Sequence, residues 1–247
     1  MRKFLSILAA FATLTLSACA AIHDESGYTP PMRTLPAQDP HAAQQFTVYD
    51  PIEGTNRRIY KFNAQFDEYV FLPLVDAYDF VIPDYVNDRI SSFFSNIGEF
   101  RNSTNAVLQA EPDNALISVG RFAINSTVGL LGFYDPAKHI GLKQRKKDFG
   151  QTLARWGAGP GAYVMLPVLG PSNLRDTAGK AVDWLAFAWV VPSKIEHETA
   201  YKVTYYGLLP VNARANNDFR YNSTGSPFEY ELVRFVTTQG RALQVKE

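Results

Sequence analysis

Cys19 is the only cysteine of this chain, and the residues around it indicate which reaction its thiol undergoes. It follows Leu16–Ala18, where small residues precede the thiol as in a bacterial lipobox. Before it lies a short basic segment and then an apolar stretch, residues 4–16, that is too short to span a bilayer as a stable helix. We expect residues 1–18 to be a lipoprotein signal peptide and Cys19 to receive the lipid. The alternative is an ordinary signal peptide that happens to contain a cysteine.

Acylation at Cys19 would anchor the protein firmly, since two acyl chains already suffice for stable attachment. The next residue is Ala20, not the Asp that resembles an inner-membrane retention signal, which favours the outer membrane of a Gram-negative cell. Residues 19–48 contain recurrent prolines and no apolar clusters, so we expect an acylated N-terminus and a flexible tether. The ordered domain is expected over 49–240, followed by a C-terminal tail at 241–247.

The other residues capable of chemistry form no recognisable catalytic pattern. The histidines are isolated in the sequence and lack zinc-ligand spacing, and neither a nucleophile elbow nor a P-loop motif occurs. The single thiol is committed to lipid, which leaves no cysteine nucleophile. The chain has 24 basic and 24 acidic residues and gives no polybasic footprint for nucleic acid. We therefore expect no enzyme activity, no metal, no cofactor and no nucleic-acid partner.

A small basic run, Lys143 with residues 145–147, has two interpretations. It is either a solvated loop or a contact for lipid phosphates or an acidic partner.

The segment from Phe149 to Pro171 is unusual because it is apolar and yet dense in residues that break regular structure. It carries five glycines and three prolines, and its only charge is Arg155. A flexible linker would be rich in Ser, Glu and Lys instead. We expect this segment to stay largely outside helices and strands.

The elements that must position these residues are mainly α-helices. Apolar residues recur at helical spacing over 55–70 and again over 86–97, where Gly98 indicates the helix end. Pro73 and Pro83 predict a kink or break between these helices. A further helix is expected to begin at Pro112, because proline suits the first helical position.

Three more helices are expected towards the C-terminus. One carries the apolar residues of 174–189 behind a cap at Ser172, one covers about 195–209, and the last begins at Pro227 behind Ser226. Strand-like alternation is scarce, and no segment of the mature chain offers the roughly 18 uncharged apolar residues of a membrane-spanning helix. The predicted fold class is mainly α.

Four segments in order along the chain, together with the lipobox, resemble the MlaA family, also called VacJ. They are DPIEGTNRRIYKFN (50–63), FFSNIGE (93–99), GRFAINSTVGLLGFYD (120–135) and DFGQTLARWGAGPGAYVMLPVLGPSNLRD (148–176). The resemblance implies a single helical ring-like domain in the outer membrane around a central amphipathic channel. It also implies removal of misplaced phospholipids from the outer leaflet and their transfer to a periplasmic lipid carrier (MlaC-like), beside a trimeric porin.

The polar residues within the family motifs have two interpretations, as helix caps and turns or as the lining of a wet path through an apolar protein. Arg175 and Asp176 are adjacent, so we expect them to point different ways and to act as separate hydrogen-bonding groups. The set is Asp50, Glu53, Asn56, Arg57, Asn96, Glu99, Asp148, Gln151, Arg175 and Asp176.

A lipid path needs apolar surroundings for the tails and polar ones for the headgroup. Irregular backbone at membrane depth is tolerated where it is buried or lines a wet cavity. On this basis we expect the apolar, glycine-rich segment 149–171 to line the path, its part 156–169 in particular, and 123–133 to form the facing wall. The residues concerned are Ala123, Gly129, Gly132, Phe133, Trp156, Gly157, Gly159, Gly161, Tyr163 and Leu166.

Two other classes of function stay open at this point. A structural or assembly lipoprotein could dock on a porin without any lipid channel. A lipid-degrading enzyme would need a nucleophile and base that the sequence does not reveal.

Overall fold

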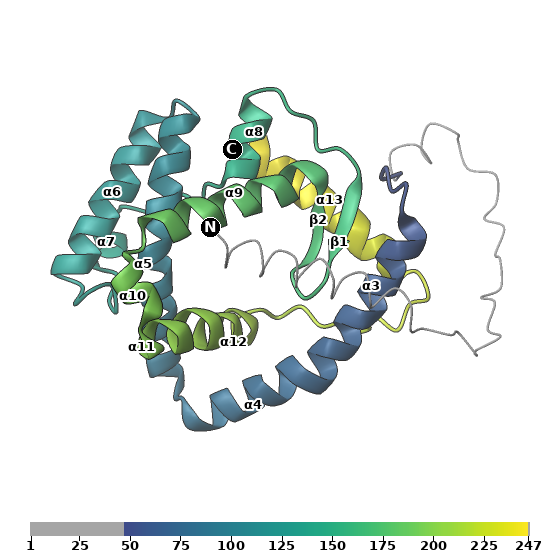
Figure 1. The fold of residues 1–247 in the computed structure, drawn as a ribbon, viewed down its shortest axis with the longest axis horizontal. Coiled ribbons are helices and arrows are strands. Elements are labelled where there is room, and N and C mark those ends of the chain that lie inside the picture. Colours follow the sequence, from purple (N-terminus) through teal and green to yellow (C-terminus); the bar gives the residue numbers. More distant parts are fainter. Residues whose placement is uncertain (1–46, 247) are drawn as a thin grey trace. The chain divides into compact units, whose positions relative to one another are not determined.

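The computed structural model describes residues 47–246, and these form a mainly α-helical fold, as expected (Figure 1). Predictions on the signal peptide, Cys19 and most of the tether lie outside the described residues. The first half contains α3 (Glu53–Phe66), η1 (Asp67–Phe71), α4 (Leu72–Val81), α5 (Asp84–Leu108), α6 (Pro112–Thr127) and α7 (Pro136–His139). The second half contains α8 (Phe149–Arg155), β1 (Tyr163–Leu166), β2 (Gly170–Asn173), α9 (Leu174–Val190), α10 (Ser193–His197), α11 (Thr199–Lys202), η2 (Val203–Leu208), α12 (Leu209–Ala215) and α13 (Glu229–Lys246).

Two π-helical turns, η1 and η2, let helices continue where proline would otherwise break them. Pro73 and Pro210 each occupy the second position of the helix that follows such a turn. A proline ring collides with the carbonyl one α-helical turn earlier, and a wider π-turn relieves that collision. Pro73 therefore introduces no break, whereas Pro83 separates α4 from α5, so one of the two expected interruptions is present.

Helix α5 runs ten residues further than the sequence pattern indicates, because Gly98 lies inside it and does not end it. Nothing within 4 Å crowds this glycine. Beyond it the buried face is carried by polar residues, Asn102 and Asn105 among them, so apolar periodicity fails to mark the helix. Pro112 begins α6 as predicted.

The apolar segment 149–171 is more regular than expected. Its start forms α8, and Tyr163–Leu166 pairs antiparallel with Gly170–Asn173 in a two-stranded hairpin. Asn63 holds the hairpin turn through hydrogen bonds to the Leu166 carbonyl (2.9 Å) and from the Val168 amide (2.8 Å). The prediction that this segment avoids regular structure is therefore wrong, because cross-strand bonds and α3 satisfy its backbone.

The C-terminal helices differ from the predictions mainly at their caps. Asn173, not Ser172, caps α9 by accepting a hydrogen bond from the Asp176 amide at 2.8 Å. The last helix begins at Glu229, two residues after the predicted start. It continues to Lys246 and so includes residues that the sequence assigns to a tail.

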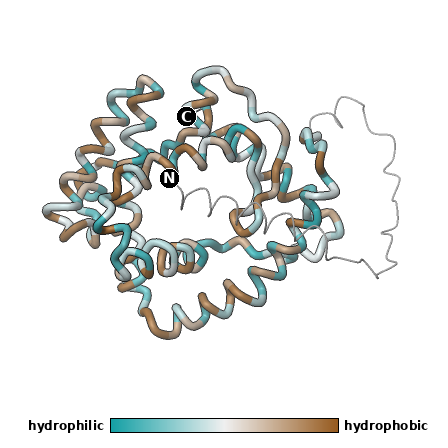
Figure 2. The backbone as a smooth tube through the Cα atoms, viewed as in Figure 1, coloured by the Kyte–Doolittle hydropathy of each residue, from teal (hydrophilic) through white to brown (hydrophobic). Residues whose placement is uncertain are grey.

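The interior of the described domain contains more polar than apolar side chains, and many large apolar side chains are exposed. Glycines aside, the buried residues comprise 12 hydrophobic and 17 polar or charged ones, so polar side chains dominate the interior. The small apolar core contains Tyr60, Met165 and Tyr230 between α3, β1 and α13. Large apolar side chains instead remain outside, with Phe80 of α4 and Trp189 of α9 each 92% exposed. Figure 2 shows hydrophobic residues recurring along α4 and α6.

Within residues 47–246, no helix combines the length and the apolarity that a bilayer crossing requires.

Candidate functional site

A cavity of about 810 Å³ lies among α5, the hairpin, α9, η2, α12 and α13. Its lining has two chemical characters. The apolar part includes Phe94, Ile97, Trp184, Phe187, Tyr205 and Leu209. The charged part includes Arg101, Asp148, Asp176, Lys180, Asp183 and Arg241.

The apolar part comes from α5 and α9, which supply their side chains at helical spacing. Phe94 and Ile97 lie three residues apart on α5, and Trp184 and Phe187 lie three apart on α9. Phe187 stacks on Tyr205 of η2, with ring centroids 5.2 Å apart. Aromatic stacking thus fixes η2 beside α9 where both line the cavity.

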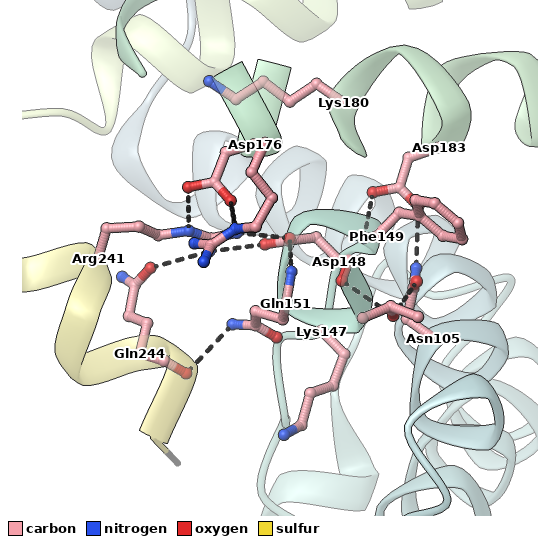
Figure 3. A network of polar contacts seen from close by, with 12 residues as sticks. Asn105, Lys147, Asp148, Phe149, Gln151, Asp176, Lys180, Asp183, Arg241 and Gln244 are labelled. Carbon is pink, nitrogen blue, oxygen red and sulfur yellow. Dashed lines mark hydrogen bonds and ion pairs between the residues drawn. The ribbon is translucent and has the colours of Figure 1, made fainter. Parts of the chain in front are cut away.

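The charged part is organised by Arg241 of α13, which lies between two carboxylates (Figure 3). Its guanidinium donates to Asp148 at 2.6 and 2.8 Å and to Asp176 at 2.8 and 3.2 Å. Burial alone would raise the pKa of both carboxyls. The hydrogen bonds and charge of Arg241 outweigh burial and hold the pKa of Asp148 and of Asp176 below the usual range.

Asp148 and Asp176 also belong to the starts of α8 and α9. Asp148 caps α8 by accepting from the Gln151 amide at 2.9 Å, which satisfies one of the free N–H groups of the first turn. Arg175 donates to Asp176 at 2.9 Å, so the expectation that these neighbours act separately is wrong. The arginine side chain is long enough for its Nε to reach the adjacent carboxylate. Capping and cavity lining are therefore combined at these positions.

Asp183 is a third carboxylate of the cavity, and it is held by neutral donors. It accepts hydrogen bonds from the Phe149 amide and from the Asn105 side chain, both at 2.9 Å. Burial raises the pKa of Asp183 in spite of these two bonds.

The other cavity cations, Arg101 and Lys180, take no part in an ion pair with any described residue. Lys180 makes one long hydrogen bond, 3.4 Å from its ammonium to the Ser172 hydroxyl. Figure 3 shows its ammonium apart from the Arg241 network. The surrounding protein lowers the pKa of Lys180 by desolvation, although Asp176 opposes that effect.

The first family motif, residues 50–63, connects the two ends of the domain and lies outside the cavity. Arg234 of α13 donates to Asp50 and Glu53, each at 3.0 Å, and Arg57 bonds Glu53 and Glu231. Asn56 donates to Asp50 at 2.7 Å and accepts from the Met165 amide of β1 at 2.9 Å. These contacts attach α3 to both α13 and the hairpin.

Asn96 and Glu99 join α5 to α6 and do not line the cavity. Glu99 is fully buried and pairs with Arg121 at 2.6 Å, and Arg121 also contacts Asp135 at 2.9 Å. Asn96 donates to Ser126 at 3.0 Å. This network is a buried polar interface in which the charges have partners.

The residues expected to form channel walls do not lie together at one site. Tyr163 lines the cavity. Gly129 and Gly132 lie in close packing, where a methyl group would come within 2.4 Å of the Asn125 carbonyl oxygen or 2.6 Å of the Asn96 side chain. Outside the cavity lining are Ala123, Phe133, Trp156, Gly157, Gly159, Gly161 and Leu166. Within this set the structure brings only Tyr163 to the described cavity.

The basic run is divided by the fold. Lys147 is buried and pairs with Glu111 at 2.7 Å, whereas Lys143, Arg145 and Lys146 are exposed.

Sequence patterns did not single out Arg101, Lys180 or Arg241. Arg241 lies 65 residues from Asp176 and 93 from Asp148, so no local spacing announces the network. The only available signal is that Lys180 and Asp183 lie in the part of α9 beyond Thr177, which is otherwise free of charged residues. In the described part of the chain no group of three or more potential metal-binding side chains occurs.

Comparison with known proteins identifies a family and several related sequences. A family model described as MlaA lipoprotein matches residues 48–244. An uncharacterized protein of Rickettsia felis is 39% identical over 172 residues, which cover 70% of this chain and 60% of that protein. The "Intermembrane phospholipid transport system lipoprotein MlaA" of Escherichia coli K12 is 35% identical over 138 residues, 54% of this chain and 55% of that one. The chain thus spans about half to three fifths of these curated relatives.

A solved structure from a study of the structural basis for maintenance of bacterial outer membrane lipid asymmetry also matches. The TM-score is 0.57 at 27% identity, over 75% of this chain and 98% of that chain.

Proposed function

This chain belongs to the MlaA lipoprotein family, and on that premise we propose that it removes mislocalised phospholipids from the outer leaflet of the outer membrane. It passes them to a periplasmic carrier for retrograde transport and so maintains lipid asymmetry. Its partners are phospholipids, a trimeric porin and an MlaC-like carrier. It is lipid-anchored from the periplasmic side through Cys19 and acts by transport, without catalysing a reaction.

The observation that carries this proposal is the inverted distribution of polar and apolar residues. In water, charged and amide side chains rarely become fully buried, and contiguous apolar surface is kept small. Here Asn56, Glu99 and Asn102 are essentially inaccessible, while Trp189 and Phe80 are almost fully exposed. Such a surface is stable against hydrocarbon and costly against water, which supports a position within a lipid environment.

The cavity supports the transport step. A phospholipid has roughly 30 methylenes, each costing about 0.8 kcal/mol to expose to water, so lifting one bare through water costs about 25 kcal/mol. A passive protein lowers this barrier by offering apolar walls to the tails and polar groups to the headgroup. Phe94 and Trp184 provide apolar walls for the tails, and Arg241 and Lys180 provide polar groups for the headgroup.

The alternative is a structural or assembly lipoprotein that docks on a porin without conducting lipid. The two are distinguished by measuring phospholipid on the cell surface with an externally added phospholipase. A deletion strain should expose more outer-leaflet phospholipid, and the full chain should reverse this. A cavity-blocking variant that still associates with the porin should fail to complement. Full complementation by such a variant would favour the docking role.

A further inference from the structure

The cavity holds two cations that form no ion pair with its carboxylates, although Asp183 interacts electrostatically with Arg101, and Asp176 with Lys180. Asp148 and Asp176 share Arg241, and Asp183 accepts from two neutral donors. Arg101 of α5 and Lys180 of α9 remain without an ion pair in the described chain, and both line the cavity.

The residues around Arg101 and Lys180 indicate which class of ligand would bind there. Phe94 and Ile97 lie within two turns of Arg101 on α5, and Trp184 lies one turn from Lys180 on α9. Both side chains are exposed, so a ligand can reach them, and a negatively charged group would complement them, whereas the aromatic and aliphatic walls favour hydrocarbon. The matching ligand therefore carries an anion and an apolar chain in one molecule.

We propose that Arg101 and Lys180 bind the phosphodiester of a phospholipid headgroup inside this cavity, with the acyl chains against Phe94, Ile97, Trp184 and Phe187. This inference rests on the proposed transport function and names the residues that recognise its substrate.

Both side chains are obligate donors, which suits a phosphodiester because it offers only acceptor oxygens. Arginine supplies a planar fork and lysine a compact point charge, and each makes charge-assisted hydrogen bonds to phosphate. They approach from different helices, so the phosphate is held between α5 and α9. A lipid without phosphate, such as a diacylglycerol, gains nothing from these two groups.

The test uses fluorescence quenching in the full-length lipoprotein purified in detergent micelles. Trp184 is made the only tryptophan by Trp156→Phe and Trp189→Phe, so its emission reports on the cavity. Phosphatidylglycerol or diacylglycerol with brominated acyl chains is titrated into the micelles. A second protein that keeps only Trp189, which is 92% exposed, reports contact with bulk micellar lipid.

We expect half-quenching of Trp184 at about tenfold less phosphatidylglycerol than diacylglycerol, as a charge-assisted bond implies. Arg101→Met and Lys180→Met should each reduce this preference, and the double variant should abolish it. Neither substitution removes the ion-pair partner of a buried carboxylate. Circular dichroism measures whether each variant keeps its fold. Lys61→Met removes an exposed charge of α3 outside the cavity and should leave the preference unchanged.

Three results would overturn the assignment in different ways. If both lipids quench Trp184 equally and the double variant changes nothing, the headgroup site is contradicted but the proposed lipid transport is not. Quenching of Trp189 but never of Trp184 removes lipid from the cavity and contradicts the proposed function as well. If inorganic phosphate abolishes the preference at concentrations equal to the lipid, the site binds a free anion and not a headgroup.

Discussion

Gly150 of α8 and Gly179 of α9 lie back to back, so close that a methyl group on Gly179 would come within 2.3 Å of the Gly150 nitrogen. A methyl group on Gly150 would meet Asp176 at 2.5 Å and Arg241 at 2.8 Å. The absence of a side chain at both positions lets α8 and α9 approach until Arg241 reaches both Asp148 and Asp176. The charged part of the cavity therefore depends on a glycine contact.

We predict that Gly179→Ala lowers the free energy of unfolding by about 2 kcal/mol, because the obstacle is backbone and cannot swing aside. Gly54→Ala is the matched control, since Gly54 is helical and has nothing within 4 Å. That substitution should raise stability by about 0.5 to 1 kcal/mol through reduced backbone entropy. Denaturant melts of the detergent-solubilised protein measure both, and equal effects would contradict the glycine contact.

We predict that Arg241→Met destabilises the protein by about 3 kcal/mol at neutral pH, because Asp148 and Asp176 lose their shared cation. In the wild type the pKa of both carboxyls lies below the ordinary 3.8. Their stabilisation is thus complete above that pH and lost as the pH falls through the folded-state values.

The difference between wild type and Arg241→Met should therefore persist at neutral pH and shrink as the pH falls below 3.8, as thermal melts from pH 7 down to pH 2 would show. Arg155→Met removes a 3.7 Å surface pair with Glu111 and should cost under about 1 kcal/mol. A constant gap at every pH would mean that Arg241 acts by packing alone.

The sequence predicted helices well where apolar residues form the buried stripe and poorly where polar residues do. Beyond Gly98 the buried face of α5 consists largely of asparagine and glutamate, which periodicity analysis counts as solvent-facing. A protein with a polar interior reverses the assumption behind that analysis. The hairpin escaped prediction for a related reason, since Asn63 satisfies its turn from a distant helix.

The cavity was predictable in character but not in its residues. Apolar, glycine-rich segments indicated a lipid path, and the described cavity takes Tyr163, Leu169 and Pro171 from them but no other residue. Gly132 has a φ of +95° and abuts Asn96, so its conformational freedom serves a tight turn. Arg241 meets its partners only through tertiary folding, which no local motif encodes.

We predict that Gly132→Val reduces protein abundance as well as transport, because a β-branched residue is strained at this φ and collides with Asn96. Immunoblots of envelope fractions measure abundance. Val128→Leu, at an exposed position in the same segment, should leave it unchanged. Normal abundance of Gly132→Val would return this glycine to consideration as a channel wall.

We predict that Cys19→Ser yields an unlipidated precursor that keeps its signal peptide. Serine lacks the thiol that accepts the diacylglycerol. Cells grown with a labelled fatty acid should incorporate label into the wild-type protein only. Labelled Cys19→Ser protein would contradict the lipobox assignment.

The most direct test of the cavity is a charge placed on its apolar part. Ile97 lines this apolar part from α5. Ile97→Asp presents a carboxylate to hydrocarbon, which is costly unless the tails are excluded. We expect outer-leaflet phospholipid to rise towards the level of a deletion strain, while porin association persists.

Misfolding would give the same lipid phenotype, so the variant must also pass a folding test. Ile97 is partly accessible within the cavity, and an Asp there stays in contact with water. The melting temperature and protease resistance of purified Ile97→Asp should therefore stay near those of Ile97→Leu, the conservative control that should transport normally. If folded Ile97→Asp maintains asymmetry as well as Ile97→Leu, lipid does not pass this wall, and the docking role becomes the better account of the protein.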